Sequence, residues 1–257
     1  MKSNKQKRSN NKGFAEIFGR HAVNAALLNP VRKHQKLFIS INNKDVFSKN
    51  LADLVPEINH LHNKEMFKLF GNENTHQGFV LRTSKLLQPK LEKILADSQE
   101  KKSNIVIILD QLTDPNNIGA IMRSAALFNC KTIIVSNNNA PNITGAMAKT
   151  ASGAIEIINY ISVVNLSRAI IQFKKNGYWI YGFDSNKKNN ISKELDLAKK
   201  CVLVFGAEGK GLRELTKKEC DTLVSIPMQT KNDYNIDSLN VSNACSIALF
   251  EHFKKNQ

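Results

Sequence analysis

Apolar residues recur along the chain as short unbroken runs that alternate with stretches of helical spacing. From residue 105 onward, the unbroken runs predict buried strands at 105–109, 132–136, 156–160, 178–183, 201–205 and 223–227. The stretches between them predict helices at 118–128, 143–151, 166–176, 212–220 and 239–254. Strands that alternate with helices favour a mainly parallel sheet covered on both faces. The sequence therefore predicts a large α/β domain over residues 105–257.

A shorter version of the same alternation precedes this domain. Helical spacing occurs at 18–28, 47–54 and 64–70, and strand candidates lie at 36–41 and 77–83. We therefore expect a small α/β domain over residues 14–84. Residues 85–104 are polar and rich in lysine around one helical stretch at 91–97, which indicates a linker. Residues 1–13 form a basic tail, predicted to be disordered, that is either simply solvated or contacts phosphate.

Charge narrows the range of partners. The 257 residues carry a formal net charge of +15, which points to a polyanion, either nucleic acid or an anionic membrane surface. No apolar run approaches the ~20 residues that span a bilayer, and the basic tail lacks the apolar core of a signal peptide. We therefore expect no membrane insertion.

Cysteine and histidine usage favours neither disulfides nor metal. The four cysteines are widely spaced and form no C-x-x-C pair, so we expect reduced thiols in a cytoplasmic protein. His60 and His62 flank a single leucine, but no further ligand set accompanies them. We therefore interpret them as surface residues and expect no metal site.

A dense polar cluster follows the strand predicted at 105–109. Asp110, Asp114, Asn116, Asn117 and Arg123 all lie where that strand ends and a helix begins. One interpretation is a well-capped turn, in which Asn116 or Asn117 accepts from free N–H groups of the helix. The other is a ligand site, because ligands of open α/β sheets bind outside the carboxyl ends of the strands. The number of polar groups favours the ligand site.

A second strand end carries a glycine-rich turn. Gly206, Gly209 and Gly211 follow the strand at 201–205, and Glu208 stands between them. The spacing matches neither the dinucleotide fingerprint G-x-G-x-x-G nor a P-loop. Glycines at these positions allow a tight turn or the close approach of a ligand to the backbone. The acidic residue strengthens the second interpretation.

The start of the last predicted helix is also rich in polar residues. Asp237 or Ser238 is a suitable N-cap, and Asn240, Ser242 and Asn243 follow it. Capping accounts for one such residue. It does not account for the three that come after it in a helix with an apolar far end.

Taken in order, these three segments resemble the motifs of the SpoU (TrmH-like) family of RNA ribose 2'-O-methyltransferases in the SPOUT superfamily. The first motif, Asp-Pro-x-Asn-x-Gly followed by Arg, is matched between Asp114 and Arg123. The second, Gly-x-Glu-Gly-x-Gly, is matched at 206–211, and the third by I-P-M at 226–228 with residues 238–244. One departure is the loop at 229–237, which is longer than is typical of the family and has no glycine.

The resemblance implies an α/β fold with a C-terminal SPOUT α/β knot. In that fold a deep trefoil knot in a mainly parallel sheet forms a pocket for S-adenosyl-L-methionine, and Gly206, Ile226 and Leu239 would lie against this cofactor. Family members are typically homodimers with the active site near the subunit interface. An L30e-like domain that binds RNA often precedes the knot, and residues 18–23 and 75–78 resemble its signatures.

In that small domain, the resemblance makes four residues candidates for RNA binding. They are Arg20, His21, His76 and Gln77. The alternative for these residues is helix capping and turn chemistry.

The activity implied is methyl transfer to a ribose 2'-hydroxyl of RNA, in a layout closest to the bacterial enzymes that modify a guanosine of 23S rRNA. The alternatives are a tRNA 2'-O-methyltransferase and a non-catalytic rRNA-binding assembly factor. Arg123 has been viewed as the general base of the family, but a free guanidinium stays protonated, with a pKa above ~12. We therefore favour Arg123 binding phosphate or orienting the ribose. Four further residues would shape the catalytic site by hydrogen bonding: Asn117, Glu208, Ser238 and Asn240.

Overall fold

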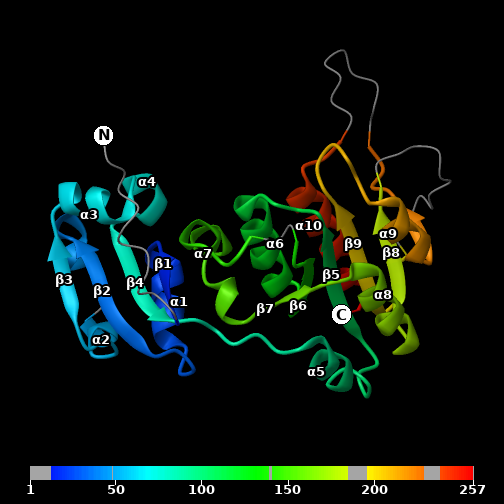
Figure 1. Ribbon diagram of the computed structural model, residues 1–257, viewed down its shortest axis with the longest axis horizontal. Coiled ribbons are helices and arrows are strands. Elements are labelled where there is room, and N and C mark those ends of the chain that lie inside the picture. The colour runs from blue at the N-terminus through cyan, green and yellow to red at the C-terminus, as the bar shows by residue number, and fades with distance from the viewer. Residues whose placement is uncertain (1–12, 48, 139–140, 185–195, 229–237, 257) are drawn as a thin grey trace, which may run out of the picture. The chain divides into compact units, whose positions relative to one another are not determined.

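The computed structural model describes residues 13–47, 49–138, 141–184, 196–228 and 238–256. The chain divides into two compact units (Figure 1). The N-terminal unit comprises Met1–Leu87 and Ile143–Glu156, and the C-terminal unit comprises Gln88–Asn142 and Ile157–Gln257. The sequence prediction placed all of residues 105–257 in one domain, whereas the segment 143–156 packs with the N-terminal unit. The predicted basic tail and the 229–237 loop lie outside the described residues, apart from Gly13.

The N-terminal unit is built on a four-stranded sheet with the order β1-β4-β2-β3. Its strands are β1 (Phe14–Phe18), β2 (His34–Ser40), β3 (Ile58–Leu61) and β4 (Phe79–Ser84). β4 pairs antiparallel with β1 and β2, and β2 pairs parallel with β3. The helical segments are α1 (Arg20–Leu28), the 3-10 helix η1 (Ile41–Val46), α2 (Lys49–Ala52), α3 (Asn63–Phe70) and α4 (Glu73–His76).

The segment 143–156 belongs to this unit through packing and a buried ion pair. Its helix α7 (Gly145–Ala151) lies so close to β1 that a Cβ atom on Gly145 would be 2.4 Å from the ring of Phe18. It ends in a 3-10 helix, η2 (Ala154–Glu156). The Glu156 carboxylate accepts hydrogen bonds from Arg32 Nε at 2.7 Å and Nη2 at 2.9 Å, and both side chains are at most 5% exposed. A buried pair of this kind is costly to break on one side, because a buried charge is left without its partner.

The C-terminal unit is a six-stranded parallel sheet with the order β10-β8-β9-β5-β6-β7. The strands are β5 (Asn104–Asp110), β6 (Thr132–Ser136), β7 (Asn159–Val163), β8 (Trp179–Phe183), β9 (Lys200–Gly206) and β10 (Thr222–Val224). β9 comes late in the chain but lies between β5 and β8. From β5 the chain adds β6 and β7 on one side, whereas β8, β9 and β10 lie on the other side. Open α/β sheets bind their ligands at such a reversal of strand order.

Helices cover both faces of this sheet (Figure 1). They are α5 (Leu91–Ala96), α6 (Pro115–Leu127), α8 (Leu166–Lys175), α9 (Glu214–Glu219) and α10 (Val241–Lys255). Val106, Ile108, Val202 and Val204 pack with α5 and α8 in one hydrophobic cluster. Side chains alternate between the two faces along a strand. The buried residues between these four therefore face the opposite side, where α6 and α10 pack on each other.

Most of the predicted elements occur, with shifted ends. The strand predicted at 156–160 is η2 followed by β7, and the strand predicted at 223–227 is the shorter β10. The helix predicted at 47–54 shrinks to α2, and β1 and β3 were not predicted. β1 runs directly into α1 and β3 has only four residues, so neither shows a distinct apolar run.

Candidate active site

The carboxyl ends of β8, β9 and β10 meet at one edge of the C-terminal sheet and border a cavity of about 440 Å³. Phe183 and Gly206 come from the strand ends, and Ile226 from the segment after β10. Ser238 and Leu239 line the cavity from the approach to α10. The structure thus brings the second and third sequence motifs to one cavity, as the resemblance implies.

The glycine-rich turn folds back on itself beside this cavity. The Gly211 N–H donates to the Ala207 carbonyl oxygen at 2.9 Å, and Gly209 and Gly211 have φ of +77° and +65°. A Cβ atom on Gly206 would lie 2.1–2.4 Å from backbone atoms of Gly211 and Leu212. Real Cβ atoms do not approach backbone this closely, so glycine at 206 is required by the returning loop itself. Of the two interpretations of this glycine, the structure therefore favours the tight turn over the approach of a ligand.

Three side chains, Asn117, Glu208 and Asn240, join the three motifs beside the cavity, and the last two line it. Asn240 Nδ2 donates to Glu208 Oε1 at 2.7 Å and to Asn117 Oδ1 at 3.0 Å. Asn117 Nδ2 donates to the same carboxylate oxygen of Glu208 at 3.2 Å. Hydrogen bonds to an ionised group are stronger than those between neutral groups, so the carboxylate holds both amides in fixed orientations. Glu208 and Asn240 are exposed, and Asn117 is partly exposed.

Asn240 is also the N-cap of α10. Its Oδ1 accepts from Ser242 N at 2.9 Å and from Ser242 Oγ at 2.5 Å. The prediction of Asp237 or Ser238 as the cap was therefore wrong, since α10 begins later than expected; Asp237 itself lies outside the described residues. The cap leaves the NH₂ end of the amide facing Glu208.

The first motif shows a similar correction. Asp114 caps α6 by accepting from Asn116 N at 3.0 Å, with Pro115 in the first helical position. The predicted cap, Asn116 or Asn117, was wrong because the helix starts earlier. As a result Asn117 lies in the first turn, where its side chain is available to Glu208.

Asp110 belongs to the support of the site and does not line the cavity. Its carboxylate is fully buried and accepts from Arg213 N at 3.1 Å, from Arg213 Nε at 2.7 Å and from Thr216 Oγ1 at 2.7 Å. These bonds fix the start of α9, directly after the glycine-rich turn. Asp110 is also the register partner of Gly206 on β9. The glycine-rich turn is therefore held to β5 at its start, through Gly206, and just after its end, through Arg213.

Arg123 lies further along α6, with its side chain exposed, and does not line the cavity. Within the described residues, its guanidinium makes no hydrogen bond or ion pair. The adjacent residue Ser124 contacts α10 through its Oγ, 2.8 Å from Ser246 Oγ. Arg123 is therefore an exposed cation on the helix that carries Asn117.

The two signatures of the small domain meet in the N-terminal unit. Gly19 N donates to the Phe79 carbonyl oxygen at 3.1 Å, which joins the end of β1 to the start of β4. Arg20, His21 and Gln77 are exposed there. His76 differs, because it is 1% exposed and its Nδ1 accepts from Gly78 N at 3.0 Å. Burial argues against the expected direct RNA contact for His76 and favours a structural role.

Neither a metal centre nor a reactive thiol is evident in the described part of the chain. No group of three or more His, Cys, Asp or Glu side chains is placed to hold a metal ion there. The four cysteines are free thiols. Burial raises the pKa of both Cys130 and Cys220 to about 12, so these thiols stay protonated at neutral pH. Among the helices described, none is long and apolar enough to cross a bilayer.

Two family models match the chain. The SpoU rRNA Methylase family matches residues 104–250, and the RNA 2'-O ribose methyltransferase substrate binding domain matches residues 17–89. The first match contains every residue of the amide–carboxylate network. The second contains all four N-terminal candidates.

Relatives and solved structures agree with these matches. The chain is 33% identical to the 23S rRNA (guanosine-2'-O-)-methyltransferase RlmB of Coxiella burnetii, over 91% of this chain and 93% of that protein. It is 34% identical to an uncharacterized tRNA/rRNA methyltransferase of Synechocystis sp., over 93% of this chain and 62% of that protein. The AdoMet-bound rRNA methyltransferase from Sinorhizobium meliloti superposes with a TM-score of 0.73 at 19% identity, covering 95% of this chain and 88% of that one.

These findings confirm the predicted fold class, an α/β-knot methyltransferase fold with a small α/β domain before it. The glycine-rich turn and the cap of α10 line a single cavity, and Asn117 in the first turn of α6 hydrogen-bonds to both. The chain therefore belongs to the SpoU rRNA methylase family.

Proposed function

We propose that this protein transfers a methyl group from S-adenosylmethionine to the ribose 2'-hydroxyl of a guanosine in 23S rRNA. The observation that carries the proposal is the network of Asn117, Glu208 and Asn240 at the mouth of the cavity. The names of several relatives, 23S rRNA guanosine-2'-O-methyltransferases, support the substrate.

The cavity suits S-adenosylmethionine in size and lining. Its volume of about 440 Å³ lies within the range of roughly 300–1,000 Å³ that is typical of small-molecule sites. Phe183 and Leu239 offer apolar surface for an adenine ring. Gly209 also lines the cavity, and nothing lies within 4 Å of the position that its Cβ atom would take, so the space beside it is open. When bound, the cofactor supplies an activated methyl group on a positively charged sulfur. Gly206, Ile226 and Leu239 would hold it from the cavity wall.

The polar residues at the mouth orient the ribose. The Glu208 carboxylate accepts hydrogen bonds and is already fixed by two amides, so it offers a hydroxyl a preorganised acceptor. Asn117 and Asn240 donate to it, and Ser238 lines the same cavity. Holding the 2'-oxygen in line for methyl transfer supplies much of the rate, because the reaction becomes effectively unimolecular. Arg123 would bind an adjacent phosphate as a permanent cation.

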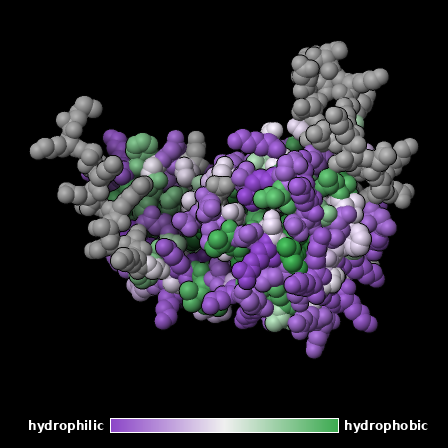
Figure 2. All heavy atoms as spheres, turned by 45° about the vertical axis from the view of Figure 1, so that its right-hand side comes forward, coloured by the Kyte–Doolittle hydropathy of each residue, from purple (hydrophilic) through white to green (hydrophobic). Residues whose placement is uncertain are grey.

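RNA recognition is assigned to the N-terminal unit and to the protein's charge. Arg20, His21 and Gln77 form an exposed polar group at the junction of β1 and β4. Hydrophilic side chains dominate the face of the larger unit seen in Figure 2, in keeping with the formal net charge of +15. Lysine and arginine in this excess favour RNA through phosphate contacts, and the 2'-hydroxyl distinguishes RNA from DNA.

We further propose a homodimer that works in the cytoplasm and forms through α6 and α10. Leu127 is 71% exposed, Phe250 48% and Ile247 36%, although all three are large apolar residues on these packed helices. The ring of Phe128, at the end of α6, lies 6.1 Å from that of Phe250 on α10. Exposed apolar patches of this kind mark protein–protein interfaces.

Sedimentation tests the dimer. Phe250→Glu should shift the protein towards monomer, whereas Leu215→Glu, a matched change at an exposed leucine on α9, should not. Equal sedimentation of both variants and wild type as monomers would contradict the proposal.

A methyl-transfer assay tests the reaction itself. The protein is incubated with methyl-labelled S-adenosylmethionine and unmodified 23S rRNA, 16S rRNA or tRNA, and the modified nucleotide is mapped. We expect label on a 2'-oxygen of one guanosine in 23S rRNA. Label on tRNA alone would show that the substrate is tRNA and not 23S rRNA. Cofactor binding without methyl transfer to any RNA would favour a non-catalytic assembly factor.

A further inference from the structure

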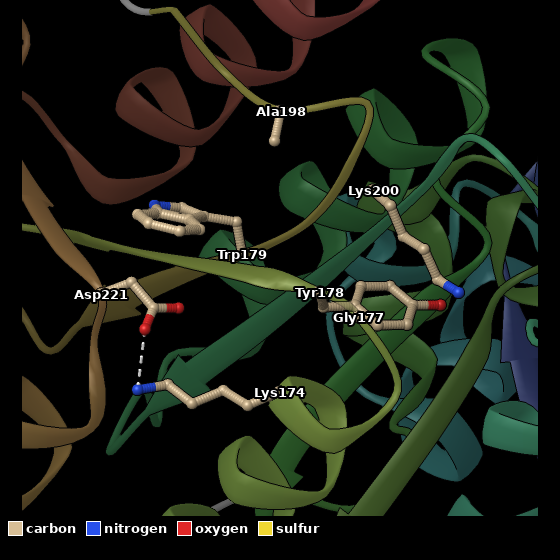
Figure 3. A pocket seen from close by; sticks show the side chains of 7 residues that line it. All are labelled: Lys174, Gly177, Tyr178, Trp179, Ala198, Lys200 and Asp221. Atoms are coloured by element: carbon tan, nitrogen blue, oxygen red, sulfur yellow. Dashed lines mark ion pairs between the residues drawn. The ribbon is translucent and has the colours of Figure 1, made fainter.

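A second pocket lies at the opposite edge of the C-terminal sheet, where the strands begin (Figure 3). It has a volume of about 490 Å³ and lies beside the first residues of β8 and β9, Trp179 and Lys200. β9 is seven residues long, so this pocket and the candidate active site are about 20 Å apart along the strand. None of its lining residues belongs to a SpoU motif.

Trp179 presents an indole ring at this pocket. The side chain is 48% exposed, and Nε1 donates to Thr222 Oγ1 at 3.0 Å, which holds the ring in place. Among the described residues, no other aromatic ring stacks on it. Tryptophan offers the largest flat apolar surface of any side chain, and leaving it half in water is unfavourable unless something covers it.

Two ammonium groups line the same pocket, and the Lys200 side chain points away from the indole, toward the Tyr178 ring (Figure 3). Lys174 Nζ lies 2.9 Å from Asp221 Oδ1, and Lys200 Nζ donates to the Ser98 carbonyl oxygen at 3.0 Å. Lys200 Nζ also lies 4.9 Å from the centre of the Tyr178 ring. A lysine has three N–H donors, so both groups keep donors for an anion. Asp221 neutralises one of the two charges, which leaves the pocket positive.

The surroundings of the pocket add positive charge. Lys199 is held beside residues 103–104, because its carbonyl oxygen accepts from Ser103 Oγ at 3.2 Å and from Asn104 N at 3.0 Å. The exposed lysines of these amino-end segments are Lys101, Lys102, Lys175 and Lys199. Acids in these segments and just before β10 are Glu100, Asp196, Glu219 and Asp221, of which Asp196 and Asp221 are already in ion pairs.

An oriented indole in a pocket that ammonium groups also line is the chemistry that binds a single strand, by base stacking and phosphate contact. We propose that this pocket holds unpaired nucleotides of the RNA substrate, with one base on Trp179 and phosphates of the same strand beside Lys174 and Lys200. The inference rests on the proposed function, because it takes RNA as the substrate. The site anchors RNA away from the target ribose, at the far end of the sheet.

Trp179 is the only tryptophan of the chain, so intrinsic tryptophan fluorescence reports on this pocket alone. Full-length protein is titrated with a single-stranded RNA oligonucleotide, with the same RNA annealed into a duplex, and with guanosine monophosphate. We expect saturable quenching and protection from iodide with the single strand. At equal nucleotide concentration, the duplex and the mononucleotide should have little effect. No quenching by the single strand would overturn the proposal, and equal quenching by the mononucleotide would replace it with a free-nucleotide site.

Two variants separate stacking from a structural role. Trp179→Ala should weaken RNA binding about five-fold or more, since stacking on an aromatic ring contributes roughly 1–3 kcal/mol per base. Trp179→Phe keeps a ring but loses the bond to Thr222, and should retain most of the affinity. Both variants should bind S-adenosylmethionine like wild type. An equal loss of RNA affinity in both would assign Trp179 to folding and overturn the proposal.

Methyl transfer is measured on the same preparation of wild type. Methyl transfer with an unchanged tryptophan signal overturns the nucleotide pocket and leaves the proposed function standing. Quenching by single-stranded RNA without methyl transfer supports the pocket and removes the proposed function.

Discussion

The two ends of the Asn240 amide have different partners. Its oxygen caps α10, and its NH₂ group donates to Glu208 and Asn117. Asn240→Asp keeps a good cap but replaces the donor with an oxygen that faces the Glu208 carboxylate. We expect this variant to keep most of its stability and to lose at least about ten-fold in methyl transfer, which corresponds to about 1.4 kcal/mol.

Asn240→Ala is the matched control. It removes both functions, so the free energy of unfolding should fall by about 1 kcal/mol in addition to the loss of activity. Thermal melts and turnover rates of the two variants separate the roles. Wild-type turnover in Asn240→Asp would show that donation to Glu208 is irrelevant to the reaction.

Arg123 offers a test of substrate positioning. Arg123→Ala removes the cation proposed to bind the substrate's phosphate, so methyl transfer should be abolished. Because Arg123 is exposed on α6 and does not line the cavity, the Kd for S-adenosylmethionine should stay unchanged. Arg123→Lys keeps the charge and should recover part of the rate if the partner is a phosphate. Calorimetry and single-turnover assays measure the two quantities. A parallel loss of cofactor binding in Arg123→Ala would place Arg123 in the cofactor site.

Gly206 is sensitive because the returning loop leaves no room for a side chain there. Even Gly206→Ala should displace the glycine-rich turn, because its Cβ would collide with the backbone of Gly211 and Leu212. We expect a lower melting temperature together with weaker cofactor binding. Gly209→Ala meets open space and should cost only about 1 kcal/mol, from its φ of +77°. Equal melting temperatures for wild type and Gly206→Ala would contradict this assignment.

At the scale of the element, Asp110 connects β5 to the start of α9. Asp110→Asn removes the charge that accepts from Arg213 and Thr216, and should lower the free energy of unfolding by about 1–3 kcal/mol. Turnover per folded molecule should hold, since Asp110 lies outside the cavity lining. Denaturant titration measures the free energy of unfolding, and the methyl-transfer rate divided by the concentration of folded protein gives the turnover. A large fall in turnover with unchanged stability would assign Asp110 to the reaction.

Periodicity predicted elements better than it predicted their ends. Unbroken apolar runs identified β5, β6, β8 and β9 within two residues, because buried parallel strands carry few polar positions. The caps were misplaced at both α6 and α10. Each helix start offers several neighbouring Asp, Asn or Ser side chains, and a pattern cannot decide which of them accepts from the backbone. The network of Asn117, Glu208 and Asn240 depends on that choice, so its geometry required the structure.

At the scale of the whole molecule, residues 105–257 are less independent than the sequence suggested. Met147, Ala148, Ala151 and Ile155 are buried within the N-terminal unit, although they lie between β6 and β7 in the chain. A fragment of residues 105–257 would lose the strand and helix that α7 packs against, and would also lack Arg32, the partner of Glu156.

We therefore expect the 105–257 fragment to melt at a lower temperature than the full chain and to aggregate more readily. Scanning calorimetry and light scattering on both proteins test this. Cooperative melting of the fragment at the temperature of the full chain would contradict the expectation. The sequence patterns did not predict the packing of residues 143–156 on the N-terminal unit, because the pairing of Arg32 with Glu156 spans more than a hundred residues.

The central position of β9 also has a consequence for folding during synthesis. β5, β6 and β7 are complete once residue 163 has emerged, but the other edge of β5 stays open until β9 has been made, about 40 residues later. Pairing between distant segments slows folding, and an open strand edge invites pairing with other chains. A nascent chain is thus most exposed to misassembly between the completion of β7 and the arrival of β9. The glycine-rich turn follows β9 directly, but the cofactor cavity is complete only after residues 225–244 have also been made, so the sheet closes this gap before the site exists.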